Sequence, residues 1–584
     1  MATRALSAEQ FESEVAAGRS FAGAKIGQID LSGRVLRGAK LSGATLQRVV
    51  LSGADLTGAD LSGAQIAGCT LQVAVLAGCS LSGAVVIDGK LSGADLRRAD
   101  LTDCRMLRAD AASADLSEAK LRGTVLIDAH LEGAKLRGAT LDGTRLEGAH
   151  MSGADLHSAH IERSSLARAD LTRADLSHAR VTDSILHRAN LKDADLSSAT
   201  IHQSVLADAD LTGAKLPRTL TASLLEGAKF QADALTGADL SHSDIDGLAV
   251  PGADLSGANL EGSSLRGANL RGANLEGAKL SQANLAGCDL EGARLGGAQI
   301  RACFLDRVNL RGTDLGGQAL EMVYLSGADL AGASLRGATI ARSFLREANL
   351  RDADLTRAAF RTGSLAGADL TGALLERATF EGINFGPADL RAIPLRSLSI
   401  VRCAFYQANL REMDLSDCDL TDCNFSEADL TGAIFGRAVL VRTTFRGAKL
   451  ELAIFEGAHA KYACFADASL SGARMSTAKL PYALFVRADL RAVNLSRCDL
   501  RGAVFAGARA EGALLTAATL AEADLAYADI RNAEVTGADF HRAVLHATLD
   551  DGVVWGTARA ETARRDDVPR LEAEAFQPPP PPRR

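Results

Sequence analysis

A five-residue period is the feature that most constrains the fold of this chain of 584 residues. From Phe21 to Leu216, and again from Leu220 to Leu545, a large apolar residue returns at nearly every fifth position, usually with a small residue two places before it. This period matches neither the 3.6 residues per turn of an α-helix nor the two-residue alternation of a free strand. Self-similarity at a short fixed period is typical of a solenoid, in which each coil contacts only its neighbours. The sequence therefore predicts one long repeat array.

A second period sets the length of one coil. Along a strand, the large residue and the small residue two places before it point inside, and the residue between them points outside. Both inward positions repeat every twenty residues, which predicts a coil of about twenty residues with four sides. The large position carries Phe385, Phe405, Phe425, Phe445, Phe465, Phe485 and Phe505, and the small position carries Thr124, Thr144, Ser164, Ser184, Ser204, Ser223 and Ser243.

The repeated motif A(D/N)LxG occurs, for example, as Ala54-Asp55-Leu56-Thr57-Gly58 and as Ala258-Asn259-Leu260-Glu261-Gly262. This motif resembles that of the pentapeptide repeat family, and the resemblance covers Phe21 to about Leu549. It implies an all-β fold, a right-handed quadrilateral parallel β-helix with Leu or Phe filling the core. The resemblance is specific for the fold and says little about function, because the motif is a scaffold signature.

The chain divides into four predicted segments: a capping helix over residues 1–20, the β-helix over 21–549, a C-terminal cap over 550–556 and a mobile Pro-rich tail over 557–584. Ser7 and Gln10 have the spacing of a capping box, and a helix carrying Phe11 could cover the first coil. Val553, Val554 and Trp555 either close the other end of the core or form a self-association surface, so a homodimer through a coil end is one alternative. The run Pro578 to Pro582 predicts polyproline II structure, as a plain tail or as a ligand for a proline-binding partner.

Three places depart from the repeat. One residue is missing near 216–220, and Gln318 and Val323 occupy small positions within 318–324. In the third place, near 383–405, the small position holds large residues and two prolines lie close by. Overfilling a tight interior costs roughly 1 to 3 kcal/mol unless the backbone moves, so we expect a bulge, bend or distorted coil there. The residues are Ile383, Ile393 and Leu398, with Pro387 and Pro394.

Composition limits the classes of function. The net charge of -8, from 64 basic and 72 acidic residues, argues against a general polyanion-binding surface, so direct nucleic-acid binding is not expected. Nine of the ten cysteines occupy the small position and no CxxC pair occurs, which predicts buried free thiols in a reducing compartment. No stretch is apolar enough for a signal peptide or a membrane span. We expect a cytoplasmic protein, with export that needs no N-terminal signal as the alternative.

No catalytic or nucleotide-binding motif is present, which predicts a protein that is not an enzyme and that holds no cofactor. One column of outward residues offers metal-binding side chains: Asp110, His130, His150 and Asp170. Such a column could hold a divalent metal. The ladder fixes its spacing without making a converging pocket, however, so a solvated face is the favoured interpretation and no metal site is predicted.

An apolar outward column is the best candidate for a partner site. Phe304, Tyr324 and Phe344 each precede a core Leu and lie one coil apart, so alternation points them outward. An exposed apolar strip of this length often marks an interaction surface, although a ladder of β-forming residues could also serve only to stabilise the sheet. Earlier members of the same column are Val85, Val125, Ile185, Val205 and Leu224.

These observations favour a non-enzymatic scaffold or protein-binding rod with an unidentified protein partner. The resemblance implies two alternatives. One is a DNA mimic that binds DNA gyrase or another type II topoisomerase and gives drug or toxin immunity. The other is a bacterial protein associated with secretion, or an effector. The length of the chain and its many arginines argue against the DNA mimic.

Overall fold

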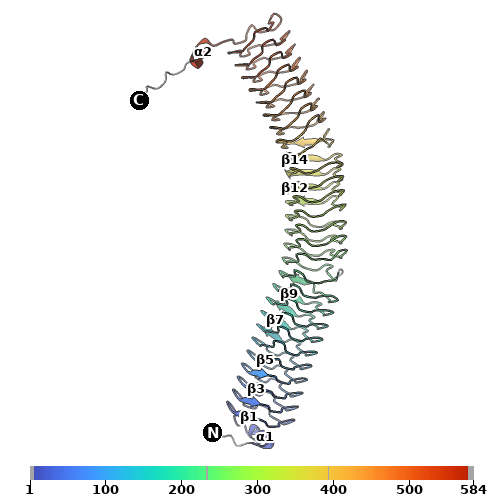
Figure 1. Ribbon diagram of the computed structural model, residues 1–584, viewed down its shortest axis with the longest axis vertical. Coiled ribbons are helices and arrows are strands. Elements are labelled where there is room, and N and C mark those ends of the chain that lie inside the picture. Colours follow the sequence, from blue (N-terminus) through green and yellow to red (C-terminus); the bar gives the residue numbers. More distant parts are fainter. Residues whose placement is uncertain (1–5, 232–233, 392, 397, 576–584) are drawn as a thin grey trace, which may run out of the picture. The chain divides into compact units, whose positions relative to one another are not determined.

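The structure is a computed structural model that describes residues 6–231, 234–391, 393–396 and 398–575. The chain forms two units, Met1–Gln299 and Ile300–Arg584, and each of them is a parallel β-solenoid (Figure 1). The described residues contain two helices, α1 (Ala8–Ala16) and α2 (Val568–Ala575). The parallel solenoid predicted from the repeat is confirmed.

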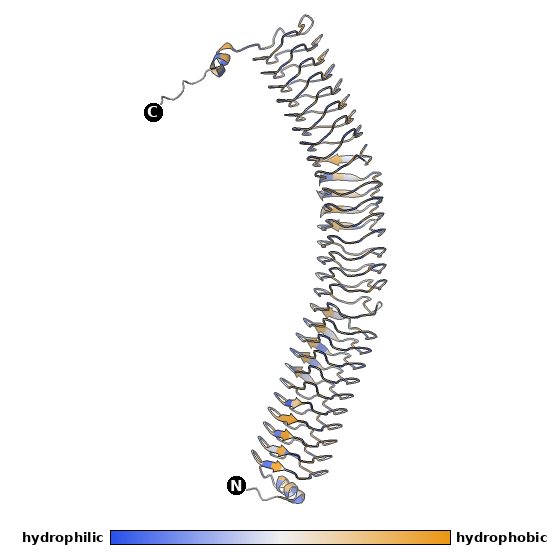
Figure 2. Cartoon of the chain, in the orientation of Figure 1, coloured by the Kyte–Doolittle hydropathy of each residue, from blue (hydrophilic) through white to orange (hydrophobic). Residues whose placement is uncertain are grey.

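Each position of the five-residue motif has a physical role, as residues 54–58 illustrate. Ala54 and Leu56 are fully buried, and Asp55 between them points outward. The Asp55 carboxylate accepts hydrogen bonds from the backbone N–H (3.1 Å) and hydroxyl (2.6 Å) of Thr57, which is the local turn bonding that Asp favours. Gly58 has φ 66°, a left-handed conformation that is free of strain only for Gly. The apolar centres of the strands appear in orange in Figure 2.

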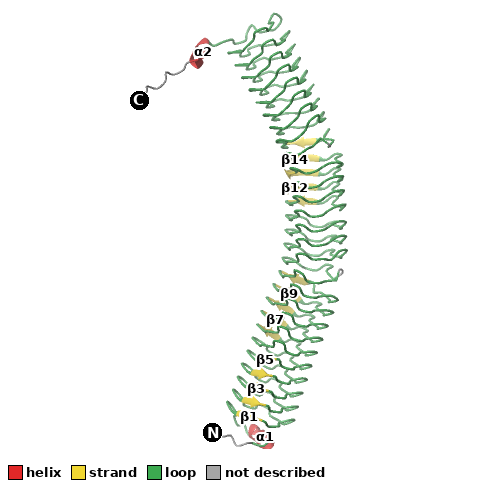
Figure 3. Ribbon diagram, viewed as in Figure 1, coloured by secondary structure: helices red, strands yellow, loops and turns green. Residues whose placement is uncertain are grey.

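The first unit contains two five-stranded parallel sheets (Figure 3). Each strand pairs with the segment twenty residues further along, as Ile26 does with Leu46. The exception is the last pair, in which Thr200 lies opposite Thr219, so that one coil is shorter by one residue. The strands are β1 (Lys25–Gly27), β2 (Thr45–Gln47), β3 (Gln65–Ala67), β4 (Val85–Ile87), β5 (Arg105–Leu107), β6 (Thr140–Asp142), β7 (His160–Glu162), β8 (Arg180–Thr182), β9 (Thr200–His202) and β10 (Thr219–Thr221).

The described residues of the second unit form one sheet of five strands, and single bridges continue the ladder on its other sides. The ladder runs through residues 318–324, because Leu320 pairs with Ile340 and Phe304 with Tyr324. The irregular coil expected there is therefore not observed in the strand pairing. The strands are β11 (Ala319–Glu321), β12 (Thr339–Phe344), β13 (Ala359–Ser364), β14 (Thr379–Asn384) and β15 (Ser399–Val401).

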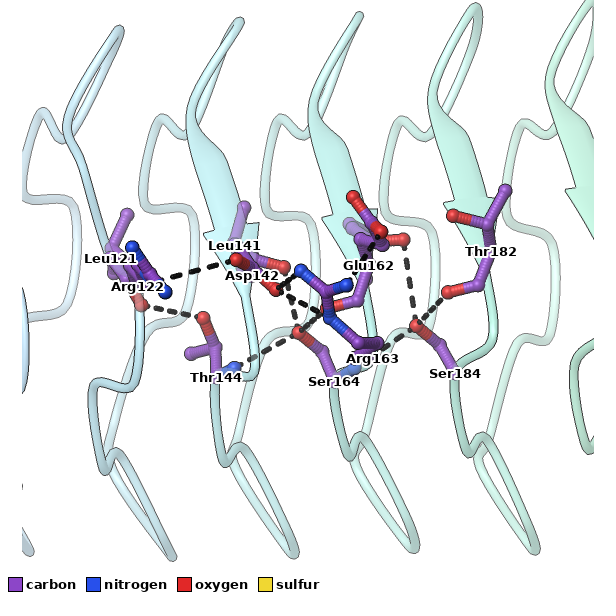
Figure 4. Close-up of polar contacts among 11 residues, drawn as sticks. Leu121, Arg122, Leu141, Asp142, Thr144, Glu162, Arg163, Ser164, Thr182 and Ser184 are labelled. Carbon is purple, nitrogen blue, oxygen red and sulfur yellow. Dashed lines mark hydrogen bonds and ion pairs between the residues drawn. The ribbon is translucent and has the colours of Figure 1, made fainter.

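Buried hydroxyls form a ladder inside the first unit (Figure 4). The Thr144 N–H donates to Ser164 Oγ (3.0 Å), and the Ser164 N–H donates to Ser184 Oγ (3.1 Å). The hydroxyls donate in turn to backbone carbonyls, as Ser164 does to Leu141 (2.7 Å). Every hydroxyl is thereby satisfied without water, as burial of a polar group requires. The same N–H to Oγ bonds continue through Ser204, Ser223 and Ser243.

Stacked phenylalanines fill one column of the interior in the later part of the second unit. The rings of Phe385 and Phe405 lie 4.8 Å apart and nearly parallel, and this column continues to Phe505. Phe455 packs edge-on against Phe465 at 5.7 Å. Ala460 occupies the large position between them and is fully buried. One coil earlier, the equivalent position between Phe435 and Phe445 holds the fully buried Leu440, so the interior accepts a large or a small residue beside the rings.

Helix α1 covers the first coil. The capping box is confirmed: the Gln10 N–H donates to Ser7 Oγ (3.3 Å) and the Ser7 N–H donates to Gln10 Oε1 (3.0 Å). Phe11 is buried and stacks on Phe21 at 4.5 Å. The Glu12 carboxylate accepts the Val35 backbone N–H (2.8 Å). The helix thus supplies both apolar cover and a hydrogen-bond acceptor to the open end of the ladder, which an exposed edge needs.

The described residues of the predicted tail are more ordered than a mobile tail, which corrects that prediction. Asp539 pairs with Arg559 and Val544 with Arg564, so the ladder extends beyond residue 556. Helix α2 then contacts the last coils, where Glu574 hydrogen-bonds Tyr527. Residues 557–575 are rich in charged residues and lack the apolar repeat from which an ordered coil could have been predicted. The prolines 578–582 lie outside the described residues.

Candidate functional site

Phe304, Tyr324 and Phe344, the aromatic column, lie together on the outside of the second unit. Adjacent rings are stacked at 5.2 and 5.5 Å, with interplanar angles of 13° and 19°. Their exposed fractions are 46%, 40% and 41%. Parallel bridges join the three residues directly, so the backbone ladder sets the spacing of the rings.

Charged residues flank the aromatic column at the neighbouring corners. Glu321 pairs with Arg301 (3.3 Å) and with Arg342 (3.6 Å). Arg307 and Arg346, at the opposite corners, form no ion pair with any described residue. The site is an apolar strip with a charged rim, which is the usual anatomy of a protein-binding patch.

The earlier apolar residues of the candidate column divide into two groups. Ile185 (45% exposed), Val205 and Leu224 (48% exposed) are joined by consecutive bridges. Val85 and Val125 are half-buried and are separated by the charged residue of the coil between them. The structure therefore brings three of these residues together as a second strip and leaves the other two apart.

The predicted end residues lie at the first coil of the first unit and near the last coils of the second unit. Phe11 lies under α1 as described above. At the other end Trp555 packs edge-on against Phe540 at 5.0 Å, and its Nε1 donates to Asp550 (3.1 Å). Val554 is 78% exposed and Val553 is half-buried. Trp555 therefore packs against the interior of the coil above which the chain continues to Arg559 and Arg564, and the self-association of Val554 stays a prediction.

The column of His and Asp residues does not form a pocket. The rings of His130 and His150 stack at 4.8 Å, and His130 Nδ1 lies 3.0 Å from Glu132. The Asp170 carboxylate accepts the backbone N–H and the hydroxyl of Thr172. Among the residues that the structure describes, no three His, Cys, Asp or Glu side chains converge as a metal-binding group.

Arginines neutralise many of the outward carboxylates. Asp489 pairs with Arg491 (2.5 Å) and Asp499 with Arg501 (2.7 Å). The hydrogen bonds from these guanidinium groups lower the pKa of both carboxyls. A surface of this kind carries alternating charge instead of a continuous negative stripe.

Sequence reasoning missed one exposed aromatic pair. Tyr462 and Tyr482 stack at 5.4 Å on the outside of the second unit, and Lys461 Nζ lies 4.8 Å from the Tyr462 ring centre. Both tyrosines have positive φ, because they stand at the turn position that usually holds Gly. Two bulky residues at that position, one coil apart, were the available signal.

The described geometry defines a class: a parallel β-solenoid whose interior is filled by side chains. The family model for pentapeptide repeats (8 copies) matches most of the chain, and the chain belongs to the pentapeptide repeat family. The matched residues are 35–72, 79–116, 114–153, 149–188, 189–219, 252–287, 278–317, 322–357, 353–391, 400–437, 438–476, 483–520 and 503–542.

Similar solved structures include HetL, a pentapeptide repeat protein involved in heterocyst differentiation regulation in the cyanobacterium Nostoc. HetL is 28% identical, and the match covers 51% of this chain and 97% of HetL, with a TM-score of 0.17. QnrB1, a plasmid-mediated fluoroquinolone resistance protein, is 17% identical over 36% of this chain and 94% of its own, with a TM-score of 0.17. No curated protein matches the chain. In the described part of the chain no helix is long and apolar enough to cross a membrane.

Proposed function

We propose that this protein is a non-enzymatic scaffold that binds another protein through the aromatic column. The observation that carries this proposal is the stack of three exposed rings, Phe304, Tyr324 and Phe344, on a backbone ladder that fixes their spacing. Large aromatic side chains dominate the binding energy of many interfaces.

The stacking also supports the proposal on energetic grounds. Each ordered side chain that an interface immobilises costs about 0.5–1.5 kcal/mol of conformational entropy. Rings that already pack against each other on adjacent strands have lost most of that freedom before a partner arrives. The column is therefore preorganised, and the loss of ordering entropy on binding is small.

The alternative explanation is that the rings serve only to stabilise the sheet, since cross-strand aromatic pairs contribute roughly 0.2–1 kcal/mol each. The two explanations differ in whether removal of the three rings abolishes the binding of a partner protein. We would compare affinity capture from native lysate by the intact protein and by a variant with Phe304, Tyr324 and Phe344 replaced by Ser. The matched control replaces Ile185, Val205 and Leu224, the other exposed strip, by Ser.

We expect a partner that the intact protein and the control retain and the aromatic-column variant loses. Retention of the same partners by all three proteins would overturn the assignment of the site.

A DNA-mimic function directed at gyrase has less support from the surface. Such mimicry needs a continuous stripe of negative charge, whereas Asp489 and Asp499 are each paired with Arg. Gyrase supercoiling in the presence of micromolar protein is the direct assay, and we expect no inhibition. The cytoplasmic location remains a prediction.

A further inference from the structure

The backbone ladder of the second unit is interrupted between two neighbouring coils. In a regular coil the N–H of a core residue donates to the carbonyl nineteen residues further along, as Leu350 does to Asp369 (2.7 Å) and Leu365 to Asn384 (2.7 Å). Leu370 and Gly372 form no such bond with any described residue. The N–H of Asp389 likewise has no bond to a described carbonyl of the preceding coil.

The interruption is confined to part of the coil. Before the opening, Ser364 pairs with Asn384. After it, Thr379 pairs with Ser399. The two coils therefore stay joined along one part of their circumference and separate along the part that includes residues 367–372 and 387–391.

Proline explains why the ladder opens here. The second turn residue of a regular coil has positive φ, as in Gly367 (71°) and Gln407 (57°). The equivalent residue is Pro387, whose ring fixes φ near −65°, and the positive φ moves to Gly386 (52°). Pro394, an outward residue further along the same coil, has no N–H to donate. Two prolines thus remove both the turn geometry and one donor of the ladder.

Large side chains in the small position act in the same direction. Ile393 and Leu398 are buried at positions where the preceding coil holds Ala373 and Ala378. A cleft of about 520 Å³ lies at the opening. Its lining residues are Gly367, Ala368, Asp369, Thr371, Pro387, Ala388, Asp389 and Arg391.

The chemistry of this cleft is that of a free sheet edge. The N–H groups of Leu370 and Gly372 and the carbonyl of Ala368 have no hydrogen-bond partner among the described residues. An anion would satisfy only the donors and a metal ion only the acceptor. The two nearest carboxylates are already paired, Asp369 with Arg351 (3.1 Å) and Asp389 with its neighbour Arg391 (2.6 Å). A ligand therefore needs alternating donors and acceptors and little charge.

We propose that this cleft binds an extended peptide segment of low net charge, which adds as a strand to the free edge at residues 368–372. Extended peptides commonly join an exposed sheet edge in this way, with main-chain hydrogen bonds giving affinity and alternate side chains giving specificity. This site is separate from the aromatic column and does not depend on it.

The test uses a random twelve-residue peptide library displayed on phage and selected on the full chain. A variant Thr371→Trp fills the cleft. Its matched control is Thr431→Trp, at the equivalent position three coils further along. The two threonines make the same turn bond, from the backbone N–H to Asp369 (3.0 Å) and to Asp429 (3.2 Å). The Thr431 hydroxyl also donates to Asp429 (2.8 Å), so the control substitution removes at least as many local contacts as Thr371→Trp.

We expect enriched peptides that bind the native chain and Thr431→Trp with equal affinity and bind Thr371→Trp at least tenfold more weakly. A synthetic copy should slow hydrogen exchange at the Leu370 and Gly372 amides. Absence of enriched peptides, equal binding to both Trp variants, or protection confined to other coils would each overturn the proposal.

A second variant restores the ladder instead of blocking the cleft. Pro387→Gly with Pro394→Ala returns the turn conformation and the missing donor, so it is expected to be at least as stable as the native chain. Slower exchange at Leu370 and Gly372 in this variant without peptide, together with at least tenfold weaker peptide binding, is the expected result. Undiminished peptide binding despite slowed exchange would contradict the proposed site.

Discussion

The coils between Thr124 and Ser243 and the coils between Phe385 and Phe505 share the same parallel pairing and, apart from the shortened coil between β9 and β10, the same length. Their interiors are nevertheless stabilised differently. The first set uses buried hydroxyls that bond the backbone of the adjacent coil. The second set uses stacked aromatic rings, from Phe385 to Phe505. Directional bonds specify which residue lies opposite which, whereas aromatic packing depends on filled volume. The comparison shows that the repeat fixes the backbone and leaves the source of stability open.

The largest effect is expected from removing a ring. Phe445 is fully buried and stacks on Phe425 at 5.3 Å and on Phe465 at 5.0 Å. Phe445→Ala should lower the free energy of unfolding of the surrounding coils by about 3–5 kcal/mol, and Leu166→Ala in the hydroxyl region by about 2–5 kcal/mol. Hydrogen exchange in the flanking coils measures both. A smaller loss for Phe445→Ala than for Leu166→Ala would show that the aromatic region does not depend more strongly on volume.

Removing a hydroxyl should have a smaller effect. Ser184→Ala deprives the Ser164 N–H of its acceptor, and an unsatisfied buried donor costs about 1–3 kcal/mol. The lower end is expected, because small residues elsewhere donate to the carbonyl three residues earlier, as Ala159 does to Leu156 (2.9 Å). Ser184→Thr is the control, since Thr occupies the same position in other coils. Unchanged stability in Ser184→Ala would remove the hydroxyl ladder as a source of stability.

Acid should weaken both regions moderately. The hydrogen bond from Lys215 lowers the pKa of Asp195 to about 2, and that from Arg491 lowers the pKa of Asp489. A depressed folded pKa contributes stability above the unfolded value, near 3.9, and this stability is lost as pH falls through the folded pKa. The urea midpoint should therefore fall between about pH 4 and pH 2. In Lys215→Met the contribution of Asp195 should shrink; a flat profile down to pH 2 would contradict this account.

Thiol labelling tests the burial of the cysteines in both interiors. It is not expected to change the stability of the protein. Burial raises the pKa of the Cys79 and Cys104 thiols to about 12, and nine of the ten free cysteines are buried. Cys464, an outward residue, is half-exposed. Native protein should react rapidly at one thiol and urea-unfolded protein at ten. Cys464→Ser should show no rapid reaction, and fast labelling at several sites would indicate that the coils open readily.

The sequence predicted the solenoid, the twenty-residue coil and the outward aromatic column, because each follows from a period that repeats many times. The exposure of Phe304, Tyr324 and Phe344 follows from strand alternation alone. The order of residues 557–575 was not predictable in this way, since Arg559 and Arg564 pair at positions that lack the apolar repeat. The interruption beside Pro387 was expected only as a distortion, because the sides along which two coils separate depend on the competition between hydrogen bonds and packing. The turn tyrosines Tyr462 and Tyr482 were overlooked because turns were assumed to hold small or polar residues.

Pairing at a fixed offset makes the coil a unit of evolutionary length change. Loss or duplication of twenty residues would remove or add one complete coil, and every later side chain would return to its former column. A change of five residues would instead move all later side chains to the adjacent side of the coil. The shortened coil between β9 and β10 is informative in this respect, because Val205 still bridges Leu224 across it. The coil that is one residue shorter is accommodated locally, and the outward residues on either side of it stay aligned. The array can therefore gain or lose complete coils while the outward residues of each strip stay in the same column.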